Sequence, residues 1–310
     1  MFVFENVSWF RILRSVRGST LPKMWGRLAF TIGMSVVITY THMKWDWLDH
    51  DLTLAPFQLT GVAIGIFLGF RNNASFDRFW EGRKLWGQIV NSTRSTTRLI
   101  LSMVGPRPIT EEIRVRHKEL VYHVIAWTHA VRQHLRRHDR LEELEGLLSP
   151  KELDRLKTET NRPNAIMQIL SQMLRQDVDR GWISVYQHVA IEQEMTRLID
   201  SQGGCERIKS TPIPYAYTVL LHQVVAAYCF ALPFGLVDDI GLYTPFVVLM
   251  VAYAFFGLDA VGDELEDPFG EDPNDLPLMT ISRMIEVNLR ERLSEESKPP
   301  LLKPVRNVLG

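Results

Sequence analysis

Blocks of nearly unbroken apolar residues alternate along this chain with long polar blocks. The apolar blocks cover residues 25–45, 54–70, 215–236 and 240–258. A helix needs roughly 20 such residues to cross the hydrocarbon core of a bilayer. The second block is short for a lone span, so we expect its helix to continue past Arg71 into polar surroundings. The pattern predicts four transmembrane helices.

The polar block at residues 71–214 is rich in Arg, Glu, Gln and Leu and lacks the alternation typical of strands, which predicts several long helices. Ser149, Pro150 and Glu152 are typical of a helix start, because they supply an N-cap, a first-turn proline and a capping-box partner. Turn chemistry at residues 161–164 then interrupts the helix. The predicted fold class is an all-α integral membrane protein with a long helical cytoplasmic region.

Basic residues orient these spans. Five lysines and arginines precede the first span or lie in its first turn, and six follow the second within residues 71–98. Only Lys44, at the end of the first span, lies near the connection between the two spans. The predicted hairpin of spans three and four has its turn at Asp238 and Asp239 and carries no basic residue there. By the positive-inside rule, both termini and the middle of the chain are cytoplasmic and the two short turns face outward.

The chain thus divides into five predicted segments. They are an N-terminal amphipathic helix (1–24), the first two spans (25–70), a cytoplasmic helical region (71–214), the last two spans (215–260), and an acidic loop with a cytoplasmic helix and tail (261–310). Aromatic and aliphatic residues interleaved with arginines suit the first segment to a membrane surface. Packing of that helix against a cytoplasmic domain is the alternative.

Two stripes of residues share the second apolar block. Glycine recurs every four residues and a large apolar residue follows each glycine: Gly61, Gly65 and Gly69, then Val62, Ile66 and Phe70. On a helix the glycine face lets a neighbouring backbone approach closely, and the second stripe points roughly 100° away. Around a symmetry axis, that second stripe would line a pore. The alternative is an ordinary buried span whose large residues meet other helices or lipid.

Composition narrows the classes of function. The 310 residues carry a net charge of −1, which excludes the global basic field of a nucleic-acid binder. Cys205 and Cys229 lie outside any C-x-x-C spacing, so neither a disulfide framework nor a structural zinc site is expected. No H-E-x-x-H, P-loop, G-x-S-x-G or dinucleotide-binding motif occurs, so we expect no enzyme and no required cofactor. The histidines between residues 117 and 138 are expected to be solvated or locally bonded.

The acidic run at residues 263–275 gathers carboxylates around a glycine turn, as hard divalent cations prefer. Its spacing does not match an EF-hand. The alternative interpretation is a charged connector that leaves the fourth span.

Three stretches together resemble the bestrophin family of ion channels in its bacterial form. They are GFRNNASFDRFWEGRKLWG from Gly69 to Gly87, Trp182-Ile183-Ser184, and Asp-Pro-Phe-Gly-Glu-Asp at residues 267–272. The resemblance implies a homopentamer in the bacterial inner membrane, with one pore on the fivefold axis lined by the second span. It places the apolar neck of that pore at Val62, Ile66 and Phe70, and a cytosolic constriction at Ile183.

In animal bestrophins the acidic motif forms a calcium clasp. The resemblance carries that clasp to the carboxylates of Glu271, Asp272 and Asp275. Here Pro273 and Asn274 replace two aspartates of the animal motif, and Pro273 stiffens the loop and removes a backbone amide. These departures weaken the expectation of calcium activation and leave a structural role for the loop.

The predicted function is a pentameric channel that passes small monovalent ions, chloride or sodium-like, through an apolar neck in a lipid bilayer. Three aspartates in the outer turn, at positions 46, 49 and 51, favour cations, although the family also includes anion-selective members. The alternative function is a non-conducting membrane scaffold or assembly protein. A membrane enzyme at the acidic run is disfavoured, because the sequence offers no paired nucleophile.

Overall fold

The computed structural model describes residues 1, 10, 15–16, 18–45, 54–305 and 307–309. Most of the predicted N-terminal amphipathic helix lies outside these residues, as do Asp46, Asp49 and Asp51. In the described part, all regular secondary structure is helical, and β-pairing is limited to two isolated bridges. The all-α class predicted from the sequence is confirmed.

The chain divides into two compact units, and each is described by itself. The apolar unit comprises Pro212–Pro268 and the described residues of Phe4–Trp80. The polar unit comprises Met1, Glu81–Thr211 and the described residues of Phe269–Gly310. Segments far apart in the sequence therefore meet within each unit.

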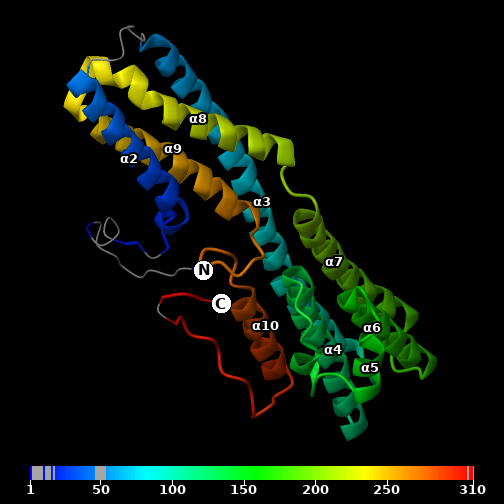
Figure 1. Cartoon of the computed structure of the whole chain (residues 1–310). Helices are drawn as coiled ribbons and strands as arrows, with labels where there is room; N and C mark the ends of the chain where they lie inside the picture. Colours follow the sequence, from blue (N-terminus) through cyan, green and yellow to red (C-terminus); the bar gives the residue numbers. More distant parts are fainter. Residues whose placement is uncertain (2–9, 11–14, 17, 46–53, 306, 310) are drawn as a thin grey trace. The chain divides into compact units, whose positions relative to one another are not determined.

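Helices of the apolar unit include α2 (Leu21–Trp45), the first part of α3 (Ala55–Met103), α8 (Tyr215–Ile240) and α9 (Thr244–Glu266) (Figure 1). Helix α2 packs against both α8 and α9, and these two helices pack against each other. Among the described residues, the segment Tyr215–Glu266, which holds α8 and α9, is apolar and long enough to cross a membrane. The two spans predicted earlier in the chain stay predictions.

Helix α3 runs without a break through the end of its apolar stretch. Its only proline, Pro56, lies in the first turn, where the missing amide hydrogen costs little. Gly105, with φ of +89°, and Pro106 follow its end, as expected of a helix stop. The expectation that the second apolar helix continues past Arg71 is confirmed.

The turn of the α8–α9 hairpin lies later than the sequence predicted. Asp238 and Asp239 belong to the last turn of α8, and the connection is the 3₁₀ turn Gly241–Tyr243. Gly241 adopts φ of +52°, which a residue without a side chain reaches at little cost. The glycine, and not the acidic pair, therefore ends the helix.

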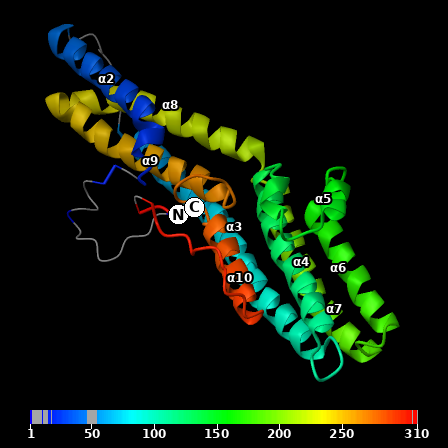
Figure 2. The ribbon, with the colours of Figure 1, turned by 90° about the horizontal axis from the view of Figure 1, so that it is seen from below.

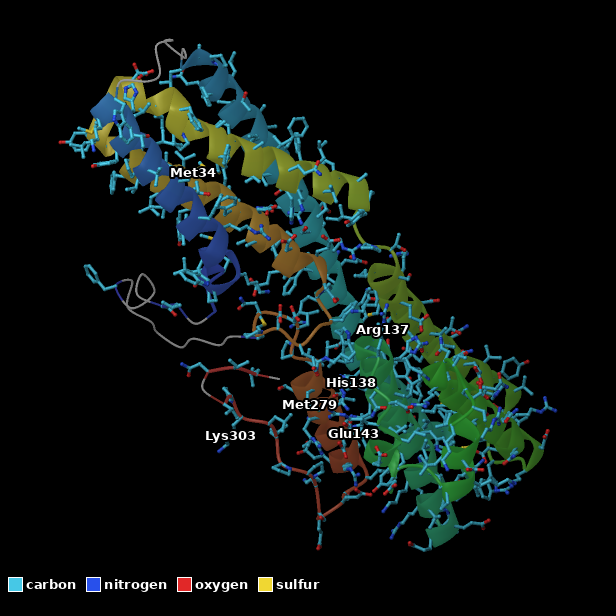
Figure 3. The ribbon with its side chains drawn as sticks, viewed as in Figure 1. Met34, Arg137, His138, Glu143, Met279 and Lys303 are labelled. Atoms are coloured by element: carbon cyan, nitrogen blue, oxygen red, sulfur yellow. The ribbon has the colours of Figure 1, made fainter. Side chains whose placement is uncertain are left out.

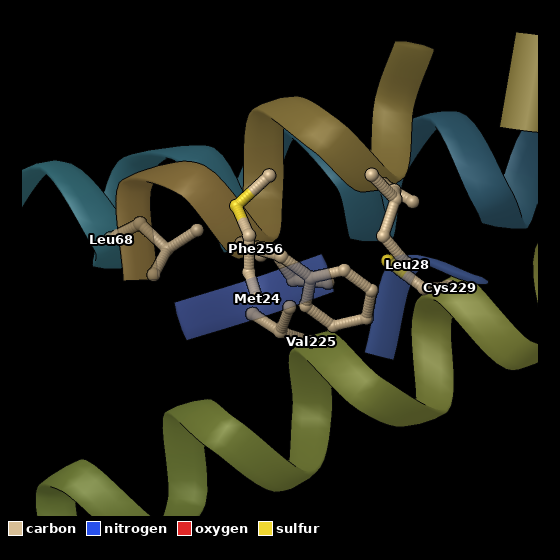
Figure 4. Packing of buried hydrophobic residues seen from close by; sticks show 8 residues of the cluster. Met24, Leu28, Leu68, Val225, Cys229 and Phe256 are labelled. Atoms are coloured by element: carbon tan, nitrogen blue, oxygen red, sulfur yellow. The ribbon is translucent and has the colours of Figure 1, made fainter. Parts of the chain in front are cut away.

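A buried cluster joins all four segments of the apolar unit. Figure 4 labels six of its members: Met24 and Leu28 from α2, Leu68 from α3, Val225 and Cys229 from α8, and Phe256 from α9. Within lipid, such a cluster holds helices together by close packing rather than by exclusion of water. It fixes which side of α3 faces the rest of its own chain.

The polar unit is built around α4 (Glu111–Arg136). Its other helices include α5 (Pro150–Leu156), α6 (Arg162–Asp179), α7 (Val185–Ser210), α10 (Leu278–Arg292) and the second part of α3. Helix α4 packs against α6, α7 and α10, and the first two lie beside it in Figure 2. Residues 120–133 of α4 are buried on every side, so this helix is the core of the unit.

Helix starts in the polar unit follow the local sequence. Ser149 forms the predicted capping box with Glu152 at the start of α5. The side chain of Asn161 accepts a hydrogen bond from the amide of Asn164 and so caps α6. The predicted interruption at residues 161–164 is therefore also the start of the next helix.

Candidate pore-lining site

The three predicted neck residues lie on the exposed face of α3. In the single subunit, Val62, Ile66 and Phe70 are 65%, 53% and 62% exposed, respectively. Ile64 and Leu68, on the opposite side of the helix, are buried in the cluster of Figure 4. Large apolar side chains left uncovered by their own chain require a neighbouring copy, lipid or a pore to face.

Within its own chain, one of the three glycines in the stripe closely approaches another helix. A Cβ atom on Gly61 would come within 2.6 Å of the Tyr228 hydroxyl oxygen, so this glycine allows a close approach. Nothing lies within 4 Å of the corresponding point at Gly65 or Gly69. The packing face of α3 in its own chain is thus set by the buried side chains and not by the stripe.

A buried ion-pair network begins directly after the neck. Arg71 has no exposed surface, and its Nη1 donates to Asp259 Oδ1 at 2.8 Å, while Nη2 pairs with Asp263. Asp259 also lies 3.2 Å from Arg27 Nη1 and 3.1 Å from His222 Nδ1. A buried guanidinium requires such partners, and removal of one typically costs about 3–5 kcal/mol. The network therefore fixes the rotation of α3 against α9.

Sequence reasoning counted Arg71 as a loop charge and missed this network. Its carboxylate partners lie about 190 positions later, with separations of 188 and 192 residues, and no local pattern connects them. One feature of the sequence agrees with the network: a glycine, Gly262, lies between the two aspartates. Gly262 lies beside the network, and a Cβ there would come within 2.5 Å of Asn72 Oδ1.

His222, Asp259 and Asp263 have ligand atoms within 4.8 Å of one another, the one such group in the described part of the chain. Arg71 contacts both carboxylates and Arg27 contacts one of them. Positive charge is therefore already supplied by arginine. We interpret the group as part of the ion-pair network and not as a metal centre.

The acidic loop does not bring its three predicted ligands together. Glu271 Oε1 faces cations, lying 3.5 Å from His138 Nε2 and 3.9 Å from Arg136 Nη1. Asp275 is buried, and its Oδ2 accepts from the backbone amide of Asp272 at 2.7 Å. Burial lowers the pKa of Arg136, and Glu271 and Asp275 oppose that shift. In the described structure Glu271 thus pairs with basic residues at and just after the end of α4, and Asp275 supports the loop.

Trp182, Ile183 and Ser184 form the junction between α6 and α7. The backbone amides of Trp182 and Ile183 both donate to the carbonyl of Asp177, at 2.8 and 3.4 Å. Ser184 caps α7, because its hydroxyl accepts from the amide of Gln187 in a capping box. The motif thus has a clear local role in ending one helix and starting the next.

Ile183 itself is buried within its own chain. Its side chain is 4% exposed in the single subunit, whereas Val185 and Tyr186 are 64% and 88% exposed. A constriction formed by Ile183 therefore requires a rearrangement that brings this side chain out.

The histidines of α4 are bonded, as expected, but three of them are not solvated. His117, His123 and His129 are buried, with ring nitrogens bonded to the Val104 carbonyl, Glu152 and Glu286, respectively. Of the two expected environments, solvated or locally bonded, these three have the bonded one, although the partners of His123 and His129 include residues far along the chain. Residues 120–133 are buried on every side, and the spacing of histidines alone did not reveal this.

Burial and hydrogen bonds shift the pKa values of two groups in these pairs. It lowers the pKa of His129, and the bond to Glu286 only partly offsets that effect. The hydrogen bond from His123 is the main reason that the pKa of Glu152 is lowered to about 2. Such pairs fasten α4 to its neighbours.

Arg132 fastens the end of α4 to α10 and to the 3₁₀ turn Leu141–Leu144. Its two terminal nitrogens contact Glu143 and Met279, both of which are labelled in Figure 3. Burial, reinforced by neighbouring arginines, lowers its pKa to about 10.

Comparison with known proteins identifies the class of protein that this arrangement represents. Residues 1–291 match the family model described as bacterial and fungal bestrophin protein. The chain belongs to the bestrophin family, and the resemblance inferred from the sequence motifs is confirmed. Membership implies a location in a membrane.

Particular relatives cover nearly the whole chain. A protein of Ralstonia nicotianae, RSc3414, is 42% identical over 297 residues, 96% of each chain. The YneE protein of Escherichia coli K12 is 36% identical over 99% of each chain. Both are named voltage-dependent anion channel-forming proteins. A crystal structure of a bestrophin homologue from Klebsiella pneumoniae is 34% identical with a TM-score of 0.82, covering 88% of this chain and all of that one.

Proposed function

We propose that this chain is one subunit of a homopentameric channel that passes small monovalent ions across a bacterial inner membrane. The pore is lined by α3 through Val62, Ile66 and Phe70. The observation that carries the proposal is the exposure of these three side chains on the face of α3 opposite its buried side. The relatives named as channel-forming proteins support the same class of function.

The proposed neck acts through dehydration. Five copies of each residue form three apolar rings, and an ion within them loses water without gaining a polar partner. Conduction then depends on whether the rings are wide enough to stay hydrated. The Arg71 network lies one residue beyond the last ring and holds the helix in the orientation that the rings need.

The exposed side of Gly65 and Gly69 suits contact with a neighbouring copy of α3. Small residues let membrane helices approach closely. A closed cyclic assembly would use this face between subunits and leave the apolar stripe for the axis.

We extend the pore to Ile183 only for a conformation in which its side chain leaves its buried position. An Ile183→Ala variant should leave single-channel conductance unchanged if the observed conformation conducts. Increased conductance would place Ile183 at a constriction.

The sign of the permeant ion has support in both directions. Asp46, Asp49 and Asp51 in the predicted outer turn favour cations, whereas the named relatives are anion channel-forming proteins. The reversal potential across a salt gradient decides between them. An Asp46→Asn/Asp49→Asn/Asp51→Asn variant should shift that potential toward anions if the outer turn sets the selectivity.

Purified protein in liposomes tests the function itself. Ion flux from liposomes that hold only this protein is expected, together with a pentamer by light scattering corrected for bound detergent. Pentamers that carry no flux would favour the non-conducting scaffold. A monomer or dimer as the only species would contradict the channel, because one lining helix cannot enclose a pore.

A further inference from the structure

A surface pocket of about 680 Å³, open to solvent, lies on the polar unit, away from every residue assigned above. The second part of α3, the loop that follows it and the end of α10 form its walls. Four arginines line it: Arg94, Arg98, Arg107 and Arg292. Its volume falls in the range of small-molecule sites.

These four arginines are exposed, and they differ from the buried arginines of the chain in their partners. Arg94 Nη2 donates to Asn288 Oδ1 at 2.8 Å, and Arg107 Nη2 donates to the Ser102 carbonyl at 3.1 Å. Within the described residues, none of the four pairs with a carboxylate. Arg71, Arg116 and Arg132 each do. In the described part of the chain, the four guanidinium groups around the pocket therefore form no ion pair with a carboxylate, and they face solvent.

One carboxylate lines the pocket in the described part of the chain, and it is partly neutralised. Glu291 Oε1 lies 3.8 Å from Lys298 Nζ. Leu101 and Leu289 supply apolar surface to the same walls. The pocket thus combines a concentration of guanidinium groups with a place for an apolar or planar part of a ligand.

The charge and the geometry select the class of ligand. One chloride ion or one carboxylate would leave most of the positive charge uncompensated, whereas a phosphate group carries roughly −1.5 to −2 at neutral pH. Guanidinium groups also bind phosphate oxygens in a bidentate fork. We propose that this pocket binds a small anion that bears one or more phosphate groups, with Leu101 and Leu289 against its apolar part.

Two sources of this chemistry can be separated by experiment. Pyrophosphate represents soluble phosphate compounds, and a short-chain phosphatidic acid represents a lipid headgroup. Each is titrated by calorimetry into the full-length protein in mild detergent, at about 0.1 M salt so that screening is moderate. Saturable binding of either probe supports the site, and competition between the two shows which source it prefers.

Variants locate the binding. An Arg94→Gln/Arg98→Gln variant should weaken binding by about tenfold or more, because charge-assisted hydrogen bonds are lost. Arg207→Gln is the matched control, since Arg207 is exposed on α7 and outside the pocket. Equal weakening in the control would overturn the proposal, as would the absence of saturable binding of both probes to the wild type.

Assembly provides a second check. If the double variant loses its oligomeric state, Arg292→Gln is titrated as intact oligomer, and binding as tight as that of the wild type would contradict the proposal. Dissociation of the variants, combined with no binding to the wild type, would mean that a neighbouring copy neutralises the arginines, which also overturns it.

Discussion

The two parts of α3 share one helical backbone but bury different fractions of their surface. Up to Trp80, its buried residues follow a single narrow line: Ile64, Leu68, Arg71 and Ser75. From Glu81 onward, adjacent residues such as Leu85 and Trp86, or Thr96 and Thr97, are buried together. Two adjacent buried residues point about 100° apart, so the second part has a wider buried face against its own chain. The first part is supported on one side and leaves the rest for lipid, a pore or other copies.

The largest expected effect comes from removing the charge of Arg71, which holds the buried side of the first part of α3 against α9. Arg71→Met should destabilise the subunit by about 3–5 kcal/mol, because Asp259 and Asp263 lose their buried partner. Thermal unfolding in detergent measures the loss. Lys84→Met is the control, since Lys84 pairs with Glu81 at the surface and exposed pairs contribute about 0–1 kcal/mol. Equal stability of the two variants would contradict the anchoring role.

The next comparison sets the two sides of the first part of α3 against each other. Leu68→Ala should cost about 2–5 kcal/mol through lost packing. The triple replacement of Val62, Ile66 and Phe70 by alanine should leave pentamer yield nearly unchanged and raise single-channel conductance, because a wider neck lowers the dehydration cost. Unchanged conductance in well-assembled pentamers would remove these residues from the pore.

Glycine substitutions sharpen the same comparison. Gly61→Ala should destabilise the subunit by about 1–3 kcal/mol, because the added methyl group would overlap the Tyr228 hydroxyl. Gly65→Ala should leave the subunit stable and reduce the fraction of pentamer, as judged by size and light scattering. A Gly65→Ala variant that assembles like the wild type would show that copies do not pack through this face.

Acid sensitivity gives a smaller effect, confined to the polar unit. The folded state holds the pKa of Glu152 at about 2, below its ordinary value of 4.5, so the stabilisation is present above pH 4.5 and is lost as the pH falls toward 2. Glu152→Gln keeps a capping-box residue but loses the charge. It should be less stable at neutral pH and lose less stability between pH 4.5 and pH 2. If the wild type and Glu152→Gln lose stability equally between pH 4.5 and pH 2, the pairing of Glu152 with His123 does not stabilise the fold.

The smallest expected effect is that of calcium removal on the channel current. Currents should persist in strong chelator, because Glu271 faces Arg136 and His138 while Asp275 bonds to its own loop. Asp272→Ala should lower expression or assembly more than it alters any response to calcium. Currents that vanish on chelation and return with micromolar calcium would show that the loop is a functional clasp.

Local chemistry explains what the sequence could predict. The capping of α5 by Ser149 and Glu152, the continuous apolar blocks and the absence of proline after the first turn of α3 are all local features of the sequence. The family motifs were equally visible, and membership in the bestrophin family followed from them. The turn of the hairpin was misplaced because the acidic pair at 238–239 gave a stronger polarity signal than Gly241.

Long-range burial explains what the sequence could not predict. Arg71 had the appearance of an ordinary cytoplasmic charge, and only its partners on α9 show that it is buried. The stripe of Gly65 and Gly69 suggested a packing face, but helix periodicity does not say whether the packing partner is in the same chain. Ile183 was placed by its motif, and its burial depends on how α6 and α7 meet.

The distance between Arg71 and its partners also bears on how the protein is made. Asp259 is synthesised 188 residues after Arg71, and at 5–20 residues per second in translation this delay is roughly 10–40 s. During that interval the nascent chain already contains the neck helix but not the carboxylates that neutralise its arginine. On the proposed topology, insertion of the two predicted spans that precede it must therefore tolerate an Arg71 that has not yet met its carboxylates. The apolar unit reaches its final packing only after α9 has left the ribosome.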